Sequence, residues 1–480
     1  MVVETRDVAA ESPGAHAEHR VPFTSEWLDM IALKAPRNPD LVPVADQRIA
    51  RAMGIIQEAL AQQGAGGARS VPSAGALFPY DIVLLTEEER DGALRPTAFK
   101  VDLVRRFCLR LPVAAEPVEA LHTELARGCT LAHPDHFLVL ARPWLSMRKY
   151  GPRGHLYTHL DAGHAATNLL GIALGRGPAE LRLRIPRPAI RELLGALLPY
   201  REAHSVISVA PSGPAPRNDQ VWIADQAADA PADSHGAMEE FCWSQIPQEL
   251  PEGGDPMAPV MSRPVVDAGD RLSQLLRIGR HEWRLLARLR RSCKTFAREA
   301  TDAPDTAAAL NTLLTPLPTD LQVSEGKPGA GLRISVVVAP GPVADACRAW
   351  LPSADIRLIV SEVVADPDGM TRLCQGQGHI SAAQALVLFH VPRDRFLVPG
   401  RPQALRDLLF QASAAAQLLY LGATRQRVAV TAVGGFDAYG LREVAGLGSD
   451  EEVVYLLALG ADGGGKEKTD RLAIAHAHGE

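Results

Sequence analysis

The sequence predicts an α+β fold built from two tandem units, and three patterns indicate it. Short apolar runs typical of strands alternate with longer stretches in which apolar residues recur at helical spacing. A strand-like run at 136–141 precedes a helical stretch rich in small residues at 156–174, and the same pair recurs at 385–389 and 403–421. Residues 211–270 are rich in Pro, Gly, Ala and Asp and show little periodicity, as a linker does. We therefore expect two diverged copies of one unit.

These changes in composition set the expected domain boundaries. Residues 1–20 are polar and are expected to be disordered. Residues 21–210 form the N-terminal half, 211–270 the linker, 271–465 the C-terminal half and 466–480 a C-terminal tail.

Helices and strands are expected to alternate in the N-terminal half. The helical stretch 44–62 places Ile49, Met53, Ile56 and Leu60 on one face. Helices are expected at 25–33, 44–62, 118–127, 156–174 and 189–198. Strands are expected at 81–86, 98–101, 136–141 and 205–209, and one short helix at 238–243 lies in the linker.

The C-terminal half repeats this order of elements. Pro342 stands in the first turn of a predicted helix, where its missing N–H costs nothing. Helices are expected at 271–290, 342–350 and 403–421, and strands at 334–338, 356–363, 385–389, 428–431 and 453–459.

The composition excludes several classes of function. The chain has 480 residues, 46% of them hydrophobic and 22% charged, and a net charge of −6. No basic cluster interleaved with aromatic residues is present, so we do not expect a nucleic-acid partner. The six cysteines are scattered without a C-x-x-C pair, which argues against a zinc site or a disulfide framework. No apolar run reaches the ~18 residues of a membrane span, and the N-terminus does not read as a signal peptide. We expect a cytoplasmic protein that does not enter a membrane.

Three histidines raise the question of a metal site. His155, His159 and His164 are spaced i, i+4 and i+9, so the third lies on the opposite face of a helix from the first two. Asp161 also lies off the face of the first pair. From these residues we do not expect a metal.

A run of small residues connects the helix expected at 44–62 to the strand expected at 81–86. The stretch 69–80, here called the small-residue loop, contains Pro72, Ser73, Ala74 and Gly75. Such a loop can be a simple tight connection. It can also let backbone N–H groups approach a flat or anionic ligand, because no large side chain holds the ligand off.

The C-terminal half contains two further motifs. Arg290, Ser292 and Lys294 follow a predicted helix, and in an extended run they share one face with Phe296. They could grip a phosphate or form a solvated helix end. The stretch Gly434–Asp437 follows a strand, and its glycines could admit a ligand edge or simply turn the chain, with its aspartate capping the next helix.

Taken together, these motifs resemble the nitroreductase-like flavoprotein superfamily, and more narrowly its SagB-type or McbC-like azoline dehydrogenases. Those enzymes oxidise thiazolines and oxazolines in ribosomal peptides. The resemblance covers about 60–210 and 280–460. The residues that carry it are Arg69, Pro72–Leu77, Pro79, Lys149–Gly151, Asp161–His164, Asn168, Arg290, Ser292, Lys294, Phe296 and Gly434–Asp437.

The resemblance implies a particular arrangement of the two halves. Members of the superfamily are usually dimers with FMN at the interface, where one subunit gives the phosphate grip and Gly-rich segment and the other gives the small-residue loop. Here these parts fall in different halves of one chain. It therefore implies two nitroreductase-like domains that form an intramolecular pseudo-dimer, with one complete FMN site and a second, degenerate one.

Site residues follow from the same resemblance. Arg290, Ser292 and Lys294 would hold the FMN phosphate, and Pro72, Ser73 and Ala74 would line the ribityl chain and ring. Gly434 and Gly435 would present amides near the reactive nitrogen. Gln375 and Gln377 are candidates for the pyrimidine edge, and Lys466 and Lys468 for additional basic contacts.

The resemblance also implies a reaction. Oxidation of an azoline to an azole removes a proton from one ring carbon and a hydride from its neighbour; FMN takes the hydride, and Lys149 and Tyr150 would take the proton. Both are weak bases in water, with a pKa of about 10. Burial can lower the pKa of the lysine, and a neighbouring lysine ammonium can lower the pKa of the tyrosine. Which of the two is the base stays open. No dinucleotide fingerprint is present, so dioxygen is the expected final acceptor.

Two alternative functions stay open, and the resemblance also implies partners. The chain could be an NAD(P)H-dependent nitro- or quinone reductase, or a flavin-free scaffold subunit of a peptide-modifying complex. Thiopeptide or linear azole-peptide biosynthesis would imply an azoline-containing precursor peptide and a cyclodehydratase, although a carrier-bound peptide is also open. The protein would be a monomeric pseudo-dimer or a homodimer.

Overall fold

The computed structural model describes residues 41–44, 46–63, 68–90, 92–103, 106–127, 129–211, 221–225, 237–246, 280–299, 301–314, 331–351, 356–396 and 402–465. Several expectations lie outside these ranges, namely those for 1–20, the helix at 25–33, residues 271–279 and the tail 466–480 with Lys466 and Lys468. Among the described helices, none is long and apolar enough to cross a membrane.

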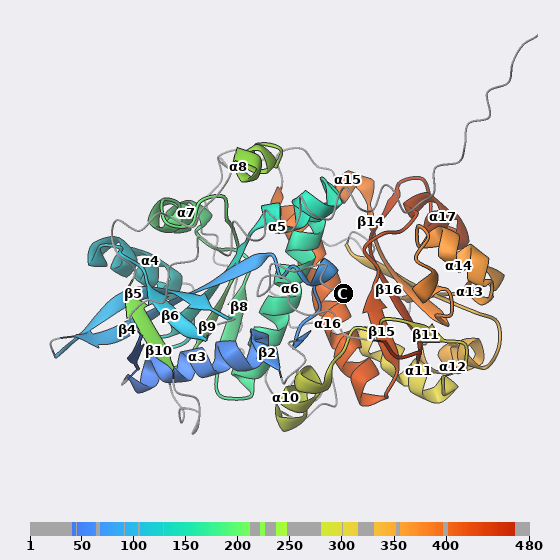
Figure 1. Cartoon of the computed structure of the whole chain (residues 1–480), viewed down its shortest axis with the longest axis horizontal. Helices are drawn as coiled ribbons and strands as arrows, with labels where there is room; N and C mark the ends of the chain where they lie inside the picture. The colour runs from blue at the N-terminus through green and yellow to red at the C-terminus, as the bar shows by residue number, and fades with distance from the viewer. Residues whose placement is uncertain are drawn as a thin grey trace, which may run out of the picture.

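An eight-stranded sheet forms the core of the N-terminal half (Figure 1). Its strands, in spatial order, are β1 (Val42–Pro43), β10 (Trp222–Asp225), β6 (Phe107–Arg110), β5 (Ala93–Asp102), β4 (Tyr80–Arg90), β7 (Asp135–Ala141), β9 (Glu202–Val209) and β8 (Ala179–Arg182). Neighbours pair antiparallel except β10 and β6, which are parallel. β10 lies within the stretch predicted to be a linker.

Helices cover both faces of this sheet, which explains why its central strands are almost wholly apolar. Successive side chains of a strand point to opposite faces. Ile82 and Leu84 of β4 pack in one core with α3 and α6, whereas Val83 and Leu85 pack in another with α4 and α7. The helices are α3 (Gln47–Leu60), α4 (Ala115–Arg127), α5 (Pro143–Tyr150), α6 (Arg153–Leu174), α7 (Arg187–Leu194) and α8 (Ala237–Ser244).

A six-stranded sheet forms the core of the C-terminal half. Its strands are β11 (Phe296–Ala297), β16 (Glu451–Asp462), β14 (Ala385–Pro392), β12 (Arg333–Val338) and β13 (Ile356–Val360), and β15 (Ala429–Ala432) also pairs with β16. The helices are α10 (Arg280–Leu289), α11 (Ala303–Leu310), α12 (Pro342–Trp350), α13 (Glu362–Ala365), α14 (Pro367–Leu373), α15 (Arg393–Phe396), α16 (Pro402–Arg425) and α17 (Ala438–Val444). Short pieces complete the chain: β2 (Gln62–Gln63), β3 (Ala68–Arg69) and the 3-10 turns Ala74–Ala76, Asn311–Leu314 and Gly378–Ile380.

The two sheets share a common arrangement of strands. The order β4-β7-β9-β8 in the first corresponds to β12-β14-β16-β15 in the second, with every pair antiparallel. The register shifts at equivalent places, between Val139 and Leu140 of β7 and between Phe389 and His390 of β14. The fifth strand differs, since β5 runs antiparallel to β4 whereas β13 runs parallel to β12.

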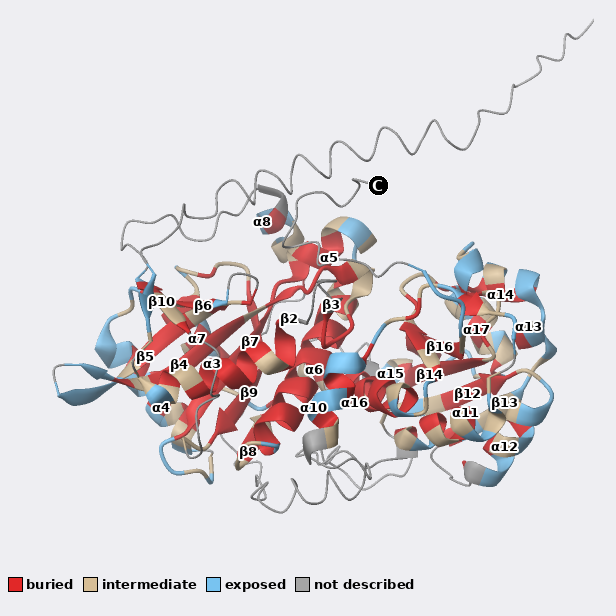
Figure 2. Ribbon diagram, turned by 60° about the horizontal axis from the view of Figure 1, so that its bottom comes forward, coloured by how far each residue is buried: buried red, intermediate tan, exposed pale blue. Residues whose placement is uncertain are grey.

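Two long helices, α6 and α16, pack against each other between the sheets (Figures 1 and 2). Small residues allow the close approach, because a Cβ on Gly163 of α6 would overlap the Ser413 hydroxyl of α16. Their described residues are mostly buried, in α6 from Tyr157 to Leu174 and in α16 from Leu408 to Ala423 (Figure 2). Residues from both halves therefore meet along these helices.

One predicted element ends earlier than expected. The extended stretch predicted at 356–363 stops at Val360, because the Ser361 side chain accepts a hydrogen bond from the Val363 amide and caps α13. The run from 290 to 295 is likewise irregular, and strand geometry begins only at Phe296.

Candidate functional site

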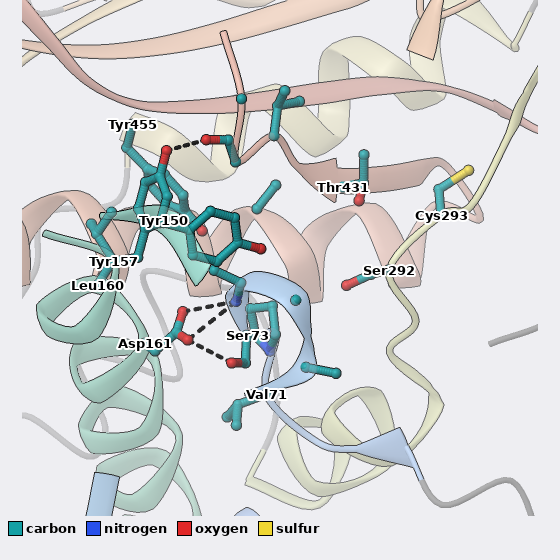
Figure 3. A pocket seen from close by; sticks show the side chains of 18 of the residues that line it. Val71, Ser73, Tyr150, Tyr157, Leu160, Asp161, Ser292, Cys293, Thr431 and Tyr455 are labelled. Carbon is teal, nitrogen blue, oxygen red and sulfur yellow. Dashed lines mark hydrogen bonds between the residues drawn. The ribbon is translucent and has the colours of Figure 1, made fainter. Parts of the chain in front are cut away.

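A cavity of about 790 Å³ lies where the two halves meet, and both halves line it (Figure 3). This volume is in the range of small-molecule and cofactor sites. The predicted site residues that the structure describes all line it: Pro72, Ser73, Ala74, Lys149, Tyr150, Arg290, Ser292, Lys294, Gln375, Gln377, Gly434 and Gly435. Phe296, expected on the same face as Ser292, instead packs in the hydrophobic core of the C-terminal half.

The small-residue loop forms one wall of the cavity, and Asp161 of α6 holds it in place (Figure 3). The Ser73 hydroxyl donates to Asp161 Oδ2 at 2.5 Å, and the Ala74 amide donates to the same carboxylate at 3.1 Å. The Ser73 hydroxyl also accepts from the Phe78 amide at 2.8 Å. Burial raises the pKa of Asp161 to about 7, although the Ser73 hydrogen bond opposes this. The loop is thus anchored to α6 by a buried carboxyl group.

Lys149 and Tyr150, at the end of α5, converge on Gly75. A Cβ on Gly75 would lie 2.7 Å from Lys149 Nζ and 2.8 Å from the Tyr150 hydroxyl. The Tyr150 ring also lies 3.7 Å from the corresponding position on Gly434 and packs edge-on against Tyr157. The amine and the phenol thus reach the same point of the cavity, between the small-residue loop and the Gly-rich segment.

Arg290 joins the C-terminal half to the small-residue loop. Its guanidinium donates to the carbonyl oxygens of Arg69 at 2.8 Å and Ser70 at 3.0 Å, and to Ser292 Oγ at 3.1 Å. The side chain is 4% exposed. A buried arginine with several directed hydrogen bonds holds both segments in a fixed geometry. Arg290 therefore positions the loop as well as lining the cavity.

Glutamine side chains hold the Gly434–Asp437 turn from behind. Gln377 Nε2 donates to the Gly435 carbonyl at 2.6 Å, and Gln375 Nε2 donates to the Phe436 carbonyl at 3.2 Å. The Tyr157 hydroxyl of the N-terminal half donates to the Gly434 carbonyl. The carbonyl groups of the turn therefore accept hydrogen bonds, and the two glutamine side chains hold its backbone in place.

The cavity has a positive charge balance within a chain whose net charge is −6. Among the described lining residues, six are arginine or lysine and one is a carboxylate, Asp161, whose oxygens bind the loop. The basic residues are Arg69, Lys149, Arg153, Arg290, Arg291 and Lys294. Such a site favours an anionic ligand.

Sequence reasoning did not assign roles to several lining residues. Arg153, Tyr157 and Asp161 recur at i, i+4 and i+8 along α6, and that spacing could have identified one helical face directed into the cavity. Tyr420 and Tyr455 come from a helix and a strand of the C-terminal half that looked like ordinary core elements.

The residues present fit an FMN. Clustered cations suit a phosphate, and the aromatic rings of Tyr150 and Tyr157, which pack edge-on against each other, suit a flat ring system. Gly434 adds no side chain beside these rings, and the atom nearest to its Cβ position is 3.7 Å away, on the Tyr150 ring.

Comparisons with known proteins identify the fold. Residues 287–461 match the model of the nitroreductase family. A protein described as a nitroreductase from Anabaena variabilis is similar in structure, with a TM-score of 0.50, 15% identity and coverage of 86% of this chain and 87% of that chain. No curated protein is similar to the chain at a significant level.

Other structures match less of the chain. A nitroreductase family protein from Clostridium novyi has a TM-score of 0.26 and 13% identity, covering 37% of this chain and 85% of that chain. The NADPH:FMN oxidoreductase of Vibrio harveyi, complexed with NAD+, has a TM-score of 0.26 and 14% identity, covering 38% of this chain and 69% of that chain. The chain thus has a nitroreductase-like fold with a nitroreductase family domain in its C-terminal region, which suggests a flavin-dependent oxidoreductase.

Proposed function

We propose that the protein is an FMN-dependent dehydrogenase that oxidises thiazolines or oxazolines of a peptide to thiazoles or oxazoles. The convergence of Lys149 Nζ and the Tyr150 hydroxyl on Gly75 carries the proposal. Two groups that can exchange a proton are directed to one point of a positively charged cavity. An azoline dehydrogenase needs such a pair, because a ring proton must leave together with a hydride.

We further propose that the two halves form an intramolecular pseudo-dimer with one composite FMN site. The shared strand order and the equivalent register shifts support a duplicated unit. The lining of the cavity supports a single composite site, because the small-residue loop comes from the N-terminal half and the Gly434–Asp437 turn from the C-terminal half. Each half then contributes a part that the other lacks.

The cofactor would be held by residues of both halves. Ser292 and Lys294, with Arg290 beside them, would bind the phosphate, and the loop at Pro72–Ala74 would face the ribityl chain and ring. When bound, FMN supplies the two-electron acceptor that azoline oxidation requires. The Gly434 and Gly435 backbone would lie along the edge of the ring.

The protein's own residues would manage the proton. Tyr150 packs against Tyr157, and Lys149 Nζ lies 5.1 Å from the centre of the Tyr150 ring, so the amine and the phenol would act at the same place in the cavity. The pair would accept the proton of the azoline carbon as the neighbouring carbon loses its hydride. With dioxygen as the final acceptor, the overall reaction is azoline plus dioxygen to azole plus hydrogen peroxide.

The proposal includes a cellular context. The substrate would be an azoline-containing precursor peptide of thiopeptide or linear azole-peptide biosynthesis, delivered by a cyclodehydratase. The protein would act in the cytoplasm, as a monomeric pseudo-dimer or as a homodimer.

The test is an assay of Lys149→Ala and Tyr150→Phe on an azoline peptide with FMN-loaded protein. Removing a proton-transfer group costs about 10²–10⁴-fold in rate, so each variant should lose at least about 100-fold while retaining flavin. Arg148→Ala is the matched control, because Arg148 lies in the same helix and its Nε binds the Leu145 carbonyl. If the protein reduces nitro compounds or quinones with NAD(P)H and does not oxidise the azoline, the result would instead favour a reductase. A colourless protein that takes up no added FMN would favour a scaffold.

A further inference from the structure

His155, His159 and Glu202 form a second cluster, on the face of α6 that points away from the cavity. His155 and His159 lie one turn apart, and each comes two residues before a cavity-lining position, Tyr157 or Asp161. Two residues correspond to about 200° of rotation, so the histidines face the other side of the helix. There they meet Glu202 at the start of β9.

The three side chains bring one ligand atom each to a common point. His155 Nε2 and His159 Nε2 lie 3.0 and 3.1 Å from Glu202 Oε2, and 3.2 Å from each other. Tetrahedral zinc ligands at about 2.0–2.1 Å from the ion stand about 3.3 Å apart. The triangle therefore has nearly the dimensions of one face of a zinc coordination tetrahedron.

With an ionised carboxylate, hydrogen bonding alone does not satisfy this triangle. If both imidazoles donate to the carboxylate, two N–H groups face each other across 3.2 Å. If one imidazole turns its lone pair inward to accept from the other, that lone pair also faces the carboxylate oxygen at close range. Each arrangement leaves one edge with two donors or two acceptors. A cation at the centre would use all three lone pairs at once.

Burial and a second contact suit the carboxylate to metal binding. Glu202 is 8% exposed and directs Oε2 at the two histidines. Arg406 of α16 donates to the other oxygen, Glu202 Oε1, at 2.9 Å and fixes the carboxylate without using Oε2.

We infer that His155, His159 and Glu202 bind a divalent transition-metal ion, with Zn²⁺ the best match to two imidazoles and one carboxylate. The His155 side chain is 14% exposed, so water can complete the coordination. The ion would tie the beginning of α6 to β9 behind the cavity. Since α6 also carries Arg153, Tyr157 and Asp161, the role of the metal would be to hold that helix in place.

The C-terminal half provides a matched control. His390 Nδ1 lies 2.7 Å from Glu451 Oε2, and Arg333 also contacts Glu451, which repeats the His–Glu–Arg composition. The other ring nitrogen of His390 lies 3.0 Å from Ser335 Oγ, so this site offers one histidine where the first offers two. It should not hold a metal.

The test measures metal content in the full chain, purified with a tag that contains no histidine. After removal of metals with EDTA, the protein is dialysed against Zn²⁺ at low micromolar concentration, and bound zinc is measured by mass spectrometry. We expect one zinc per chain and a rise of several degrees in Tm. His155→Ala and Glu202→Gln should each weaken zinc binding at least about 100-fold, whereas Glu451→Gln should retain the full equivalent.

Two results would overturn the inference. One is that the wild-type protein retains no zinc, and the other is that the variants of His155 and Glu202 bind as much zinc as the wild type. Because His155 is partly exposed, His155→Asn provides a second, milder variant if Glu202→Gln does not fold. None of these readouts depends on FMN or on azoline oxidation, so the metal site and the proposed function can fail separately.

Discussion

Gly75 is the residue at which the small-residue loop meets Lys149 and Tyr150. Its φ of +66° lies in the left-handed region, and a Cβ there would lie within 2.8 Å of both functional groups. Gly75→Ala should therefore displace the pair as well as strain the loop. Because displacement of reacting groups by about 1 Å can cost about 100-fold, we predict at least a tenfold loss of azoline oxidation, measured as initial rate in flavin-loaded protein.

Gly92 offers the control for that substitution. Its φ is +76°, so an alanine there is strained in the same way, but nothing lies within 4 Å of its Cβ position. Gly92→Ala should lower stability and leave the rate per bound flavin unchanged. Equal loss of rate in both variants would mean that backbone strain, and not the crowding of Lys149 and Tyr150, causes the effect.

Asp161 makes the stability of the protein depend on pH. Burial raises its folded-state pKa to about 7, above the usual value of about 3.9 for an unfolded chain. Between these values the folded state binds a proton that the unfolded state has released, so the contribution of Asp161 to stability falls as pH rises from about 4 to about 7.

Asp161→Asn should remove this contribution and still accept hydrogen bonds from Ser73 and Ala74. Urea unfolding at pH 5 and pH 7.5 should show a smaller decrease for the variant than for wild type. A decrease of equal size would contradict the assignment.

Among single residues, the sequence predicts residues that line the cavity but not the contacts that hold them in place. The predicted site residues within the described part of the chain line the cavity. They could be predicted because the motifs that contain them are short local patterns. The anchoring of Ser73 by Asp161 joins positions 88 residues apart, and the contact of Arg290 with the Arg69 carbonyl spans 221 residues. Contacts of this kind depend on the packing of the halves, which no local pattern encodes.

At the scale of elements, the close packing of α6 on α16 gives a further prediction. A Cβ on Gly163 would overlap the Ser413 hydroxyl, so Gly163→Ala should push the helices apart. Overpacking of this kind costs about 1–3 kcal/mol, measurable as a shift in the urea midpoint. The double variant Gly163→Ala with Ser413→Gly should recover most of the loss, and Gly378→Ala, where nothing lies within 4 Å, should cost little. Additive effects of the two substitutions would contradict direct contact.

The elements with strong patterns were predicted well, and some short elements were missed. β7, α6, β14 and α16 lie within a few residues of their predicted bounds, since long apolar runs and small-residue helices are distinctive. β10 was missed because its four residues interrupt a polar stretch and form a strand only by pairing with β6. α5 was missed because it is short and starts at Pro143.

In the whole molecule, each half provides a different part of the site. The N-terminal half presents the small-residue loop and the pair Lys149–Tyr150, and the C-terminal half presents Arg290 and the Gly434–Asp437 turn. α6 and α16 bring these parts to one cavity. If this division is correct, one chain should form one flavin site that neither half can complete alone.

The ratio of FMN to protein, measured by absorbance after the purified chain is saturated, desalted and denatured, tests this claim most directly. We predict one FMN per chain, released on denaturation with the visible absorbance of free FMN. A ratio near two would contradict the single composite site, and a ratio of zero after saturation would contradict the flavoenzyme itself.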